Sequence, residues 1–266
     1  MPAVFTYPDG KGPFPMVVMV HGSGPADRDE TVGRNSPFRD IALGLARLGV
    51  ATLRYDKRTA VYPVSARGIT IEEETVDDAI SAIGLASRDT LADPSRLALL
   101  GHSLGATLAP LIALRSPAVG GVVVMAGAAR PMAAVVREQV RYLSPSGASD
   151  AYVDSLVGRV EAAAPQYFTG LMAHYSPTDS AAALHRPILV MQGERDYQVT
   201  MADFRLWQQR LGSCGQASFR SYPRLNHLFL EGPGTTSTPL EYYTPSTVPG
   251  YVIDDIAAFV GSLGGR

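Results

Sequence analysis

A serine stands at the centre of the pentapeptide Gly-His-Ser-Leu-Gly, residues 101–105, in a setting that suits a catalytic nucleophile. The pentapeptide directly follows the apolar run RLALL (96–100) and directly precedes the apolar stretch ATLAPLIALR (106–115). A strand that turns this abruptly into a helix forces the serine into a strained backbone conformation, and only small flanking residues avoid a clash. Its hydroxyl then stands exposed at the helix N-terminus. We therefore predict that Ser103 is a nucleophile.

His227 is the histidine best placed to activate this serine. A serine hydroxyl is a weak nucleophile until a base removes its proton. His227 follows the strand-like segment ASFRSY (217–222) and ends the loop PRLNH (223–227), so it can reach the same edge of a sheet. We predict that His227 is the general base. The remaining histidines fit this role less well by their positions in the sequence (His21, His102, His174 and His185).

Asp196 has the position expected of the acid that orients this base. It lies just beyond the apolar segment PILVM (187–191), in the sequence Gln-Gly-Glu-Arg-Asp. Its carboxylate can accept the proton-bearing nitrogen of His227 and thereby fix the tautomer of the ring. Glu194 is the nearest rival, but Asp196 is the shorter carboxylate and follows the Gly193 turn by three residues. In chain order the three residues are nucleophile, acid and base, each placed after a different predicted strand.

Acyl transfer also requires donors for a developing oxyanion, and two backbone N–H groups are candidates. The N–H of Leu104 begins the helix after the nucleophile. The glycine-rich segment HGSGP (21–25) follows an apolar strand, and we assign the second donor to the N–H of Ser23, with Gly24 as the alternative. This segment has neither Gly-Lys-Ser/Thr nor Gly-x-Gly-x-x-Gly spacing, which disfavours a nucleotide-phosphate loop.

Apolar runs of strand length alternate with helical patterns along the chain. This alternation is typical of an α/β fold with a mostly parallel central sheet and helices on both faces. We predict strands over 15–20, 50–55, 96–100, 121–125, 187–191 and 217–222. We predict helices over 37–48, 70–85, 104–115, 203–211 and 251–263.

Residues 128–185 interrupt this alternation. The interval has helical patterns over 132–143, 152–164 and 167–174 and no strand candidate. We predict a helical cap insertion over 128–185, inserted into a core formed by 1–127 and 186–266. Such a cap would lie above the C-terminal edge of the sheet, where open α/β folds bind ligands. The alternative is a set of surface helices without contact to a substrate.

Composition and charge limit the classes of function. The 266 residues, 46% of them hydrophobic, supply one large core, and a net charge of −2 offers no basic field for nucleic acid. No stretch approaches the ~20 apolar residues of a membrane span. No signal peptide is visible, so a cytoplasmic location is the default expectation, although a chain trimmed of a leader would look the same. The sequence leaves the oligomeric state open, with a homodimer among the candidates.

Other reactive groups have simpler interpretations. The single cysteine, Cys214, excludes an intramolecular disulfide and is expected to be incidental. The acidic cluster 72–74 is expected to be a solvated helix face rather than a metal site. The charged residues Asp27, Arg28, Asp29 and Arg58 are expected to form a salt-bridged scaffold near the site rather than contacts to a substrate. Aromatic residues of the insertion are expected to serve core and lid packing, with a few lining an acyl pocket.

Taken together, these motifs resemble those of the α/β-hydrolase superfamily, and more closely its bacterial serine esterase branch, grouped with dienelactone-hydrolase-like proteins. The resemblance implies hydrolysis of a small-molecule carboxylic ester through an acyl-enzyme, a Ser-Asp-His triad, and neither cofactor nor metal. The motifs that carry it are HGSGPADRDET (21–31), LRYDKR (53–58), GHSLG (101–105), QGERDYQVT (192–200) and LNHLF (225–229).

Two departures from the pattern limit what is transferred. Dienelactone hydrolase proper uses a cysteine nucleophile, so its substrate is not carried over to a chain with Ser103. Thr59 stands where a glycine usually follows the Asp-Lys-Arg segment, so the loop there is expected to differ in shape. Peptide or amide bonds, thioesters and acyl transfer remain alternatives, because the same triad serves each and specificity depends on the pocket. A non-catalytic small-molecule receptor on the same fold is the alternative from another class.

Overall fold

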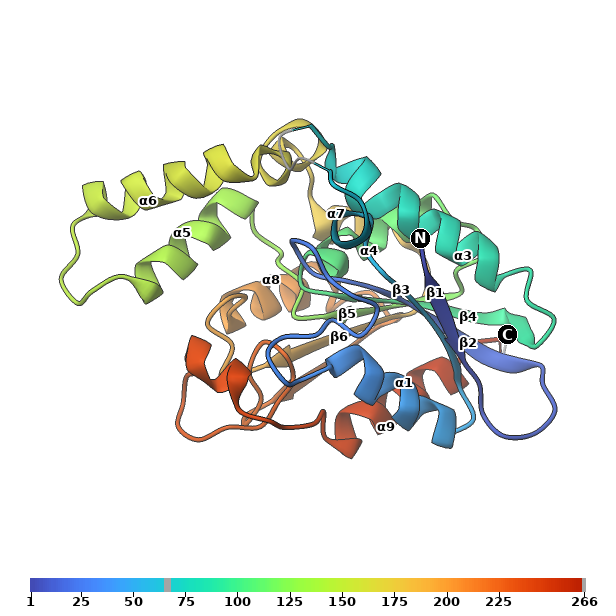
Figure 1. Ribbon diagram of the computed structural model, residues 1–266. Coiled ribbons are helices and arrows are strands. Elements are labelled where there is room, and N and C mark those ends of the chain that lie inside the picture. Colours follow the sequence, from blue (N-terminus) through green and yellow to red (C-terminus); the bar gives the residue numbers. More distant parts are fainter. Residues whose placement is uncertain (65–67, 265–266) are drawn as a thin grey trace.

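One central sheet organises the computed structural model, which describes residues 1–64 and 68–264 (Figure 1). The strands of these residues are β1 (Ala3–Thr6), β2 (Phe14–Val20), β3 (Ala51–Tyr55), β4 (Ala92–His102), β5 (Gly121–Met125), β6 (Ile188–Gly193) and β7 (Ala217–Tyr222). They form a seven-stranded sheet in the order β1-β3-β2-β4-β5-β6-β7, and only the pair β1–β3 is antiparallel. The predicted α/β class with a mostly parallel sheet is confirmed.

The central strands are apolar along most of their length because helices cover both faces of the sheet. In β2, Met16, Val18 and Val20 pack into one helical layer, whereas Val17 and Met19 pack into the other. All five side chains are fully buried. The edge strand β1 was not predicted, because four partly exposed residues give no pattern of burial on two faces.

Two layers of helices enclose the sheet. One face packs against α3 (Asp77–Ala86), α4 (Leu104–Leu114), α7 (Pro177–Leu184) and α8 (Met201–Leu211), and the opposite face packs against α1 (Pro37–Arg47) and α9 (Gly250–Gly261) (Figure 1). The loops contain α2 (Arg58–Val61), the π-helical turn η1 (Glu72–Val76) and the 3-10 turn η4 (Pro239–Tyr243). Between β5 and β6 lie α5 (Met132–Leu143), α6 (Asp150–Ala163) and the 3-10 turns η2 (Pro165–Tyr167) and η3 (Gly170–Ala173). Among the described residues, no helix has the length and apolar character needed to span a membrane.

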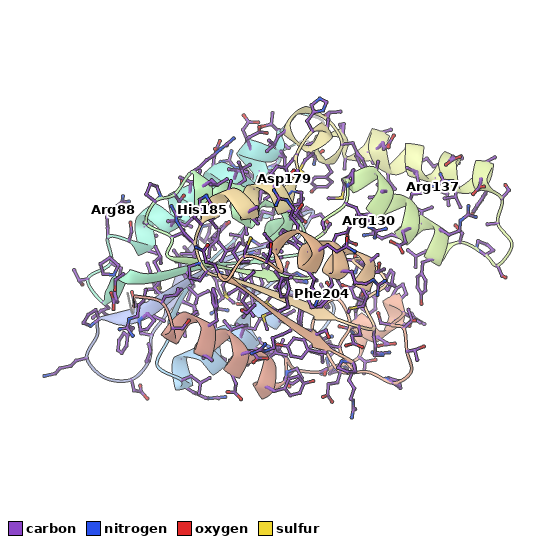
Figure 2. The ribbon with its side chains drawn as sticks, turned by 180° about the vertical axis from the view of Figure 1, so that it is seen from behind. Arg88, Arg130, Arg137, Asp179, His185 and Phe204 are labelled. Atoms are coloured by element: carbon purple, nitrogen blue, oxygen red, sulfur yellow. The ribbon has the colours of Figure 1, made fainter. Side chains whose placement is uncertain are left out.

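Helices α5 and α6 pack side by side and project from the body of the molecule (Figure 1). They bury few side chains, namely Val135 and Val136 in α5 and Val153 in α6. Figure 2 shows Arg137 out on this pair and Arg130 at its base near α8. A helical pair with so little buried surface depends on its attachment to the core for its position.

The helix predicted over 167–174 is not formed, and η2 and η3 replace it. Gly170 has a φ of +58°, in the left-handed region, which a right-handed helix cannot include. The chain therefore turns twice and continues into α7, which packs against α4 and α8. The similar expectation for 70–85 is corrected in part, because a π-helical turn precedes α3.

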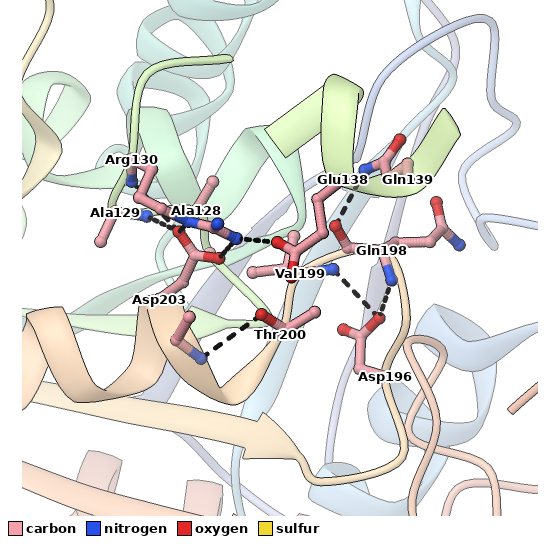
Figure 3. Close-up of polar contacts among 12 residues, drawn as sticks. Ala128, Ala129, Arg130, Glu138, Gln139, Asp196, Gln198, Val199, Thr200 and Asp203 are labelled. Carbon is pink, nitrogen blue, oxygen red and sulfur yellow. Dashed lines mark hydrogen bonds and ion pairs between the residues drawn. The ribbon is translucent and has the colours of Figure 1, made fainter. Parts of the chain in front are cut away.

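A buried carboxylate fastens the base of α5 to the core (Figure 3). Asp203 in α8 is fully buried and accepts the backbone N–H groups of Ala129 at 3.0 Å and Arg130 at 3.1 Å. The guanidinium of Arg130 also pairs with this carboxylate at 2.7 Å. Farther along α5, the Gln139 side chain donates to the carbonyl of Gln198 at 2.9 Å. The insertion is thus held at the carboxyl ends of β5 and β6.

Candidate active site

Ser103 occupies a sharp turn between β4 and α4, with φ of 53° and ψ of −116°. This backbone conformation is strained for any residue other than glycine, and strained residues are concentrated at functional sites. The flanking glycines are required because a Cβ on Gly101 would lie 2.3 Å from the carbonyl oxygen of Gly105. A Cβ on Gly105 would lie 2.3 Å from the carbonyl oxygen of Val20. Close packing of β4, α4 and β2 therefore fixes the position of the serine.

Asp196 and His227 meet beyond the ends of β6 and β7. Oδ2 of Asp196 lies 2.6 Å from Nδ1 of His227, and both side chains are buried. Because a carboxylate can only accept, Nδ1 carries the proton and Nε2 is left free to take another. The other carboxylate oxygen accepts the N–H groups of Gln198 at 2.7 Å and Val199 at 3.1 Å, and these bonds hold the carboxylate in place (Figure 3).

The rival carboxylate, Glu194, is directed elsewhere. It is exposed and accepts the hydroxyl of Ser221 at 2.8 Å. The Gln192 side chain instead donates to Oδ2 of Asp196 at 3.1 Å. The sequence did not predict this contact, because no local pattern indicates which partner a buried glutamine at a strand end will have.

Ser103 and His227 line the same cavity, of about 200 Å³. Within the described residues, the serine hydroxyl donates no hydrogen bond to the imidazole. Catalytic hydrogen bonds are often long in the absence of substrate and tighten when it binds. The chain therefore brings together all three side chains that the sequence singled out.

The two predicted oxyanion donors lie beside the serine, and their neighbours are already engaged. Ser23, Ser103 and Leu104 line a second cavity of about 170 Å³. The N–H of Gly22 donates to Glu30 at 2.7 Å, and the N–H of Gly24 donates to the hydroxyl of Tyr167 at 2.7 Å. The alternative donor, Gly24, is thus occupied, which favours Ser23.

This second cavity is mainly apolar and reaches under the projecting helices. Its lining comes from α4, from the loop after β6 and from the insertion. The insertion contributes Met132, Val135, Val136, Gln139, Val160, Tyr167 and Phe168.

A buried ion pair supports the loop that carries Ser23. Nζ of Lys57 lies 2.9 Å from Glu74, and the two side chains are 2% and 1% exposed. Lys57 also donates to the carbonyl of Gly22 at 2.8 Å. The expectation of a solvated acidic face over 72–74 was therefore wrong for Glu74, because the η1 turn directs this side chain inward to a lysine. Of the charged residues expected to form a scaffold, Arg28 pairs with Asp56, Asp29 with Arg54 on β3, and Arg58 with Asp78 on α3. Asp27 instead accepts the backbone N–H groups of Asp29 and Thr31.

His102 joins the loops on either side of the serine. Its Nε2 lies 2.8 Å from the carbonyl oxygen of His227, so this nitrogen must carry a proton. Its Nδ1 lies 3.0 Å from a carboxylate oxygen of Glu30. The two atoms do not form a hydrogen bond, but a carboxylate at this distance favours the charged imidazolium by its charge.

Shifts in pKa agree with a charged pair. Burial is the largest effect on the pKa of His102 and lowers it, but Glu30, the His227 carbonyl and Asp196 together raise this pKa above its ordinary 6.5. Burial is likewise the largest effect on the pKa of Glu30 and raises it, but His102, His21 and the N–H of Gly22 together lower this pKa below 4.5. Burial also lowers the pKa of the neighbouring His21 to about 4, so this histidine is neutral.

Among the described residues, no group of three or more His, Cys, Asp or Glu side chains is arranged to hold a metal ion. The single cysteine, Cys214, is a free thiol in the turn before β7, whereas His227 lies beyond the other end of that strand.

Comparison with known proteins agrees with the fold. A model of the alpha/beta hydrolase family matches residues 17–241, which is most of the chain. The chain belongs to this family.

Particular relatives and structures define the similarity further. The chain is 40% identical over 272 residues to the esterase EstD of Thermotoga maritima, an alignment that covers 98% of this chain. The chain spans 65% of the length of that relative. It is similar in fold to an esterase of Pyrobaculum calidifontis, with a TM-score of 0.63, 19% identity and coverage of 98% of this chain and 80% of that one. It is also similar in fold to Est1E of Butyrivibrio proteoclasticus, with a TM-score of 0.60, 14% identity and coverage of 100% and 96%.

The Glu30–His102 pair predicts a pH-dependent contribution to stability. The raised pKa of His102 gives stability that is full below pH 6.5 and is lost as pH rises through the folded-state pKa. The lowered pKa of Glu30 gives stability that is present above pH 4.5 and is lost only as pH falls through its folded-state pKa. We expect His102→Gln to reduce the free energy of unfolding by on the order of 1 kcal/mol more at about pH 5.5 than at about pH 9.

Denaturant unfolding at the two pH values measures this difference. The control is His174→Gln, a substitution of an exposed histidine in the insertion, which should show the same small effect at both pH values. An equal loss of stability at both pH values for His102→Gln would contradict the charged pair.

Proposed function

We propose that the protein is a serine carboxylesterase with Ser103 as nucleophile, His227 as general base and Asp196 as the orienting acid. The observation that carries the proposal is the 2.6 Å contact between Asp196 and His227, whose imidazole lines the same cavity as the serine of a strained elbow. The similarity to EstD, an esterase by name, supports an ester as the substrate. From the resemblance of its motifs, we also propose that the chain belongs to the bacterial serine esterase branch, grouped with dienelactone-hydrolase-like proteins.

In the first half-reaction, Oγ of Ser103 attacks the acyl carbon of the ester while its proton passes to Nε2 of His227. The carbonyl oxygen becomes an oxyanion and accepts the N–H groups of Ser23 and Leu104. The tetrahedral intermediate then collapses, the bond to the alkoxy oxygen breaks, and His227 returns the proton to that oxygen. The products of this step are a free alcohol and an ester between the acyl group and Ser103.

In the second half-reaction, water gives a proton to Nε2 of His227 and attacks the acyl-enzyme. The same two N–H groups accept the second oxyanion. Collapse breaks the bond between the acyl carbon and Oγ, and the proton on His227 returns to Ser103. Asp196 keeps its charge throughout and stabilises the imidazolium that forms twice in each cycle.

We assign the two ends of the substrate to the two cavities beside Ser103. The leaving oxygen must face His227, so we place the alcohol in the 200 Å³ cavity that this histidine lines. The acyl group then occupies the apolar 170 Å³ cavity under the insertion. We accordingly propose that the insertion of residues 128–185 acts as a cap through its part before α7, whose apolar side chains select the acyl group. Its last helix, α7, packs against α4 and α8 as part of the core. We also propose that nucleic acid is not a partner.

The test of the enzymatic proposal begins with Ser103→Ala. We expect this variant to lose turnover of p-nitrophenyl esters and reaction with a fluorophosphonate, because both require the Oγ nucleophile. Steady-state kinetics and mass spectrometry of the intact chain measure the two effects. A panel that includes anilides and thioesters separates ester hydrolysis from its alternatives. Stoichiometric labelling of the native chain with no turnover of any substrate would instead support a receptor.

A second prediction concerns the choice of acid. Asp196→Asn should lower kcat by about 10⁴-fold, because an amide cannot hold His227 in the required tautomer. Glu194→Gln, the same chemical change two residues earlier in the chain, should leave kcat unchanged within about twofold, since Glu194 bonds to Ser221 instead. Circular dichroism checks the fold of both variants. Equal losses of kcat would argue against Asp196 as the specific partner of the base.

A third prediction tests where the acyl group binds. Val136→Phe should fill part of the apolar cavity, which this residue lines, and lower kcat/KM for a C8 ester at least about 10-fold more than for a C2 ester. The matched control is Ala134→Phe, on an exposed face of the same helix, which should leave the ratio unchanged. A p-nitrophenyl ester series from C2 to C12 measures both. An unchanged chain-length profile for Val136→Phe would place the acyl group elsewhere.

A further inference from the structure

The peptide segment around Ser23 is held on both sides by side chains that the triad does not include. On one side, Glu30 accepts the N–H of Gly22, and Lys57 donates to the carbonyl of the same residue. On the other side, the hydroxyl of Tyr167 accepts the N–H of Gly24 at 2.7 Å. The backbone groups that flank the N–H of Ser23 are thus all engaged, and the direction of that N–H follows from them.

Tyr167 reaches this segment from the insertion rather than from the core. It ends the η2 turn, and its hydroxyl donates to Glu74 at 3.0 Å while it accepts from Gly24. Burial raises the pKa of Tyr167, and the adjacent Glu74 carboxylate raises it further, so the hydroxyl keeps the proton that it donates. The neighbouring side chain, Gln166, donates to the same carboxylate at 3.2 Å.

Glu74 therefore receives contacts from two parts of the molecule. Lys57 from the core pairs with it at 2.9 Å, and the insertion supplies Gln166 and Tyr167. A buried carboxylate is costly unless it is paired and hydrogen-bonded, so these contacts hold η2 in one place. Because η2 is held in this way, the hydroxyl of Tyr167 lies against the N–H of Gly24.

The ring of Tyr167 also lines the apolar cavity that Ser23, Ser103 and Leu104 share. The residue thus touches both the space assigned to the acyl group and the loop assigned to the oxyanion. A hydrogen bond that only stabilised the fold would not need to lie between these two places.

We propose that Tyr167 is a positioning residue through which the insertion orients the oxyanion-binding N–H of Ser23. The inference rests on the proposed hydrolase function. It gives the insertion a part in the chemical step in addition to the selection of the acyl group. Both tetrahedral intermediates use the same N–H, so acylation and deacylation both depend on this hydroxyl.

Tyr167→Phe tests the proposal, because it removes the hydroxyl and keeps the ring. A misdirected donor affects the transition state more than the bound ester, so we expect kcat to fall about 10- to 100-fold while KM stays within about twofold. The rate of fluorophosphonate labelling of Ser103 should fall by a similar factor, because that reaction also develops charge on an oxygen in the same place. Titration of active sites corrects both rates for any unfolded fraction.

The matched control is Tyr142→Phe. Tyr142 also belongs to the insertion, and its hydroxyl also bonds to a backbone group, the carbonyl of Ser237, at 2.9 Å. This variant should keep kcat, KM and the labelling rate of the native chain.

The outcomes separate this inference from the proposed function. A Tyr167→Phe variant with native kcat and labelling rate, or with a raised KM alone, overturns the positioning role and leaves ester hydrolysis intact. If the native chain turns over no ester but is labelled at Ser103, ester hydrolysis fails as the function, and the labelling rates still decide the role of Tyr167. If the native chain neither turns over any ester nor is labelled at Ser103, both the proposed function and the role of Tyr167 are overturned.

Discussion

The backbone of Ser103 is held in a conformation that residues with a side chain rarely adopt, and the rest of the site is arranged around it. The strain can be maintained because β2, β4 and α4 approach so closely that neither Gly101 nor Gly105 has room for a Cβ. The backbone N–H of Ser103 also donates to the carbonyl of Met125 on β5 at 2.9 Å. The sheet is therefore more than a platform for the serine, because its packing supplies the free energy that keeps the hydroxyl exposed at the start of α4.

Buried charges then fix the loops that face this hydroxyl. The imidazole of His102 links Glu30, which holds the loop of Ser23, to the backbone of His227. Such charges are expensive to remove from water, and an apolar core of the same size would often be at least as stable. Their geometry offers what apolar packing cannot, since hydrogen bonds set the direction of individual peptide groups. The charged residues of the loops thus serve position more than stability.

The insertion is joined to the core at three places, two of which are the loops that carry Asp196 and Ser23. Its first residues are bonded to Asp203, its α5 helix is bonded to the loop of Asp196 through Gln139, and its η2 turn is bonded to the loop of Ser23 through Tyr167. The outer parts of α5 and α6 have few buried contacts by comparison. Structures with 14% and 19% identity share the fold.

The sequence by itself determined the six parallel strands of the sheet, the strand-to-helix turn and the order of Ser103, Asp196 and His227. Ser103 directly follows β4, and Asp196 and His227 lie in the short loops after β6 and β7. The carboxyl ends of parallel strands must meet at one edge, so local pattern was sufficient. Only the tertiary structure decided the partners of Lys57, Glu74 and Tyr167. The acidic run 72–74 predicts a solvated face. No local pattern indicates that Lys57 and Tyr167, from distant parts of the chain, contact it. The break at Gly170 was also missed, because a single φ angle overrides a helical pattern. Burial of polar groups depends on which segments pack together, and that is a property of the folded chain.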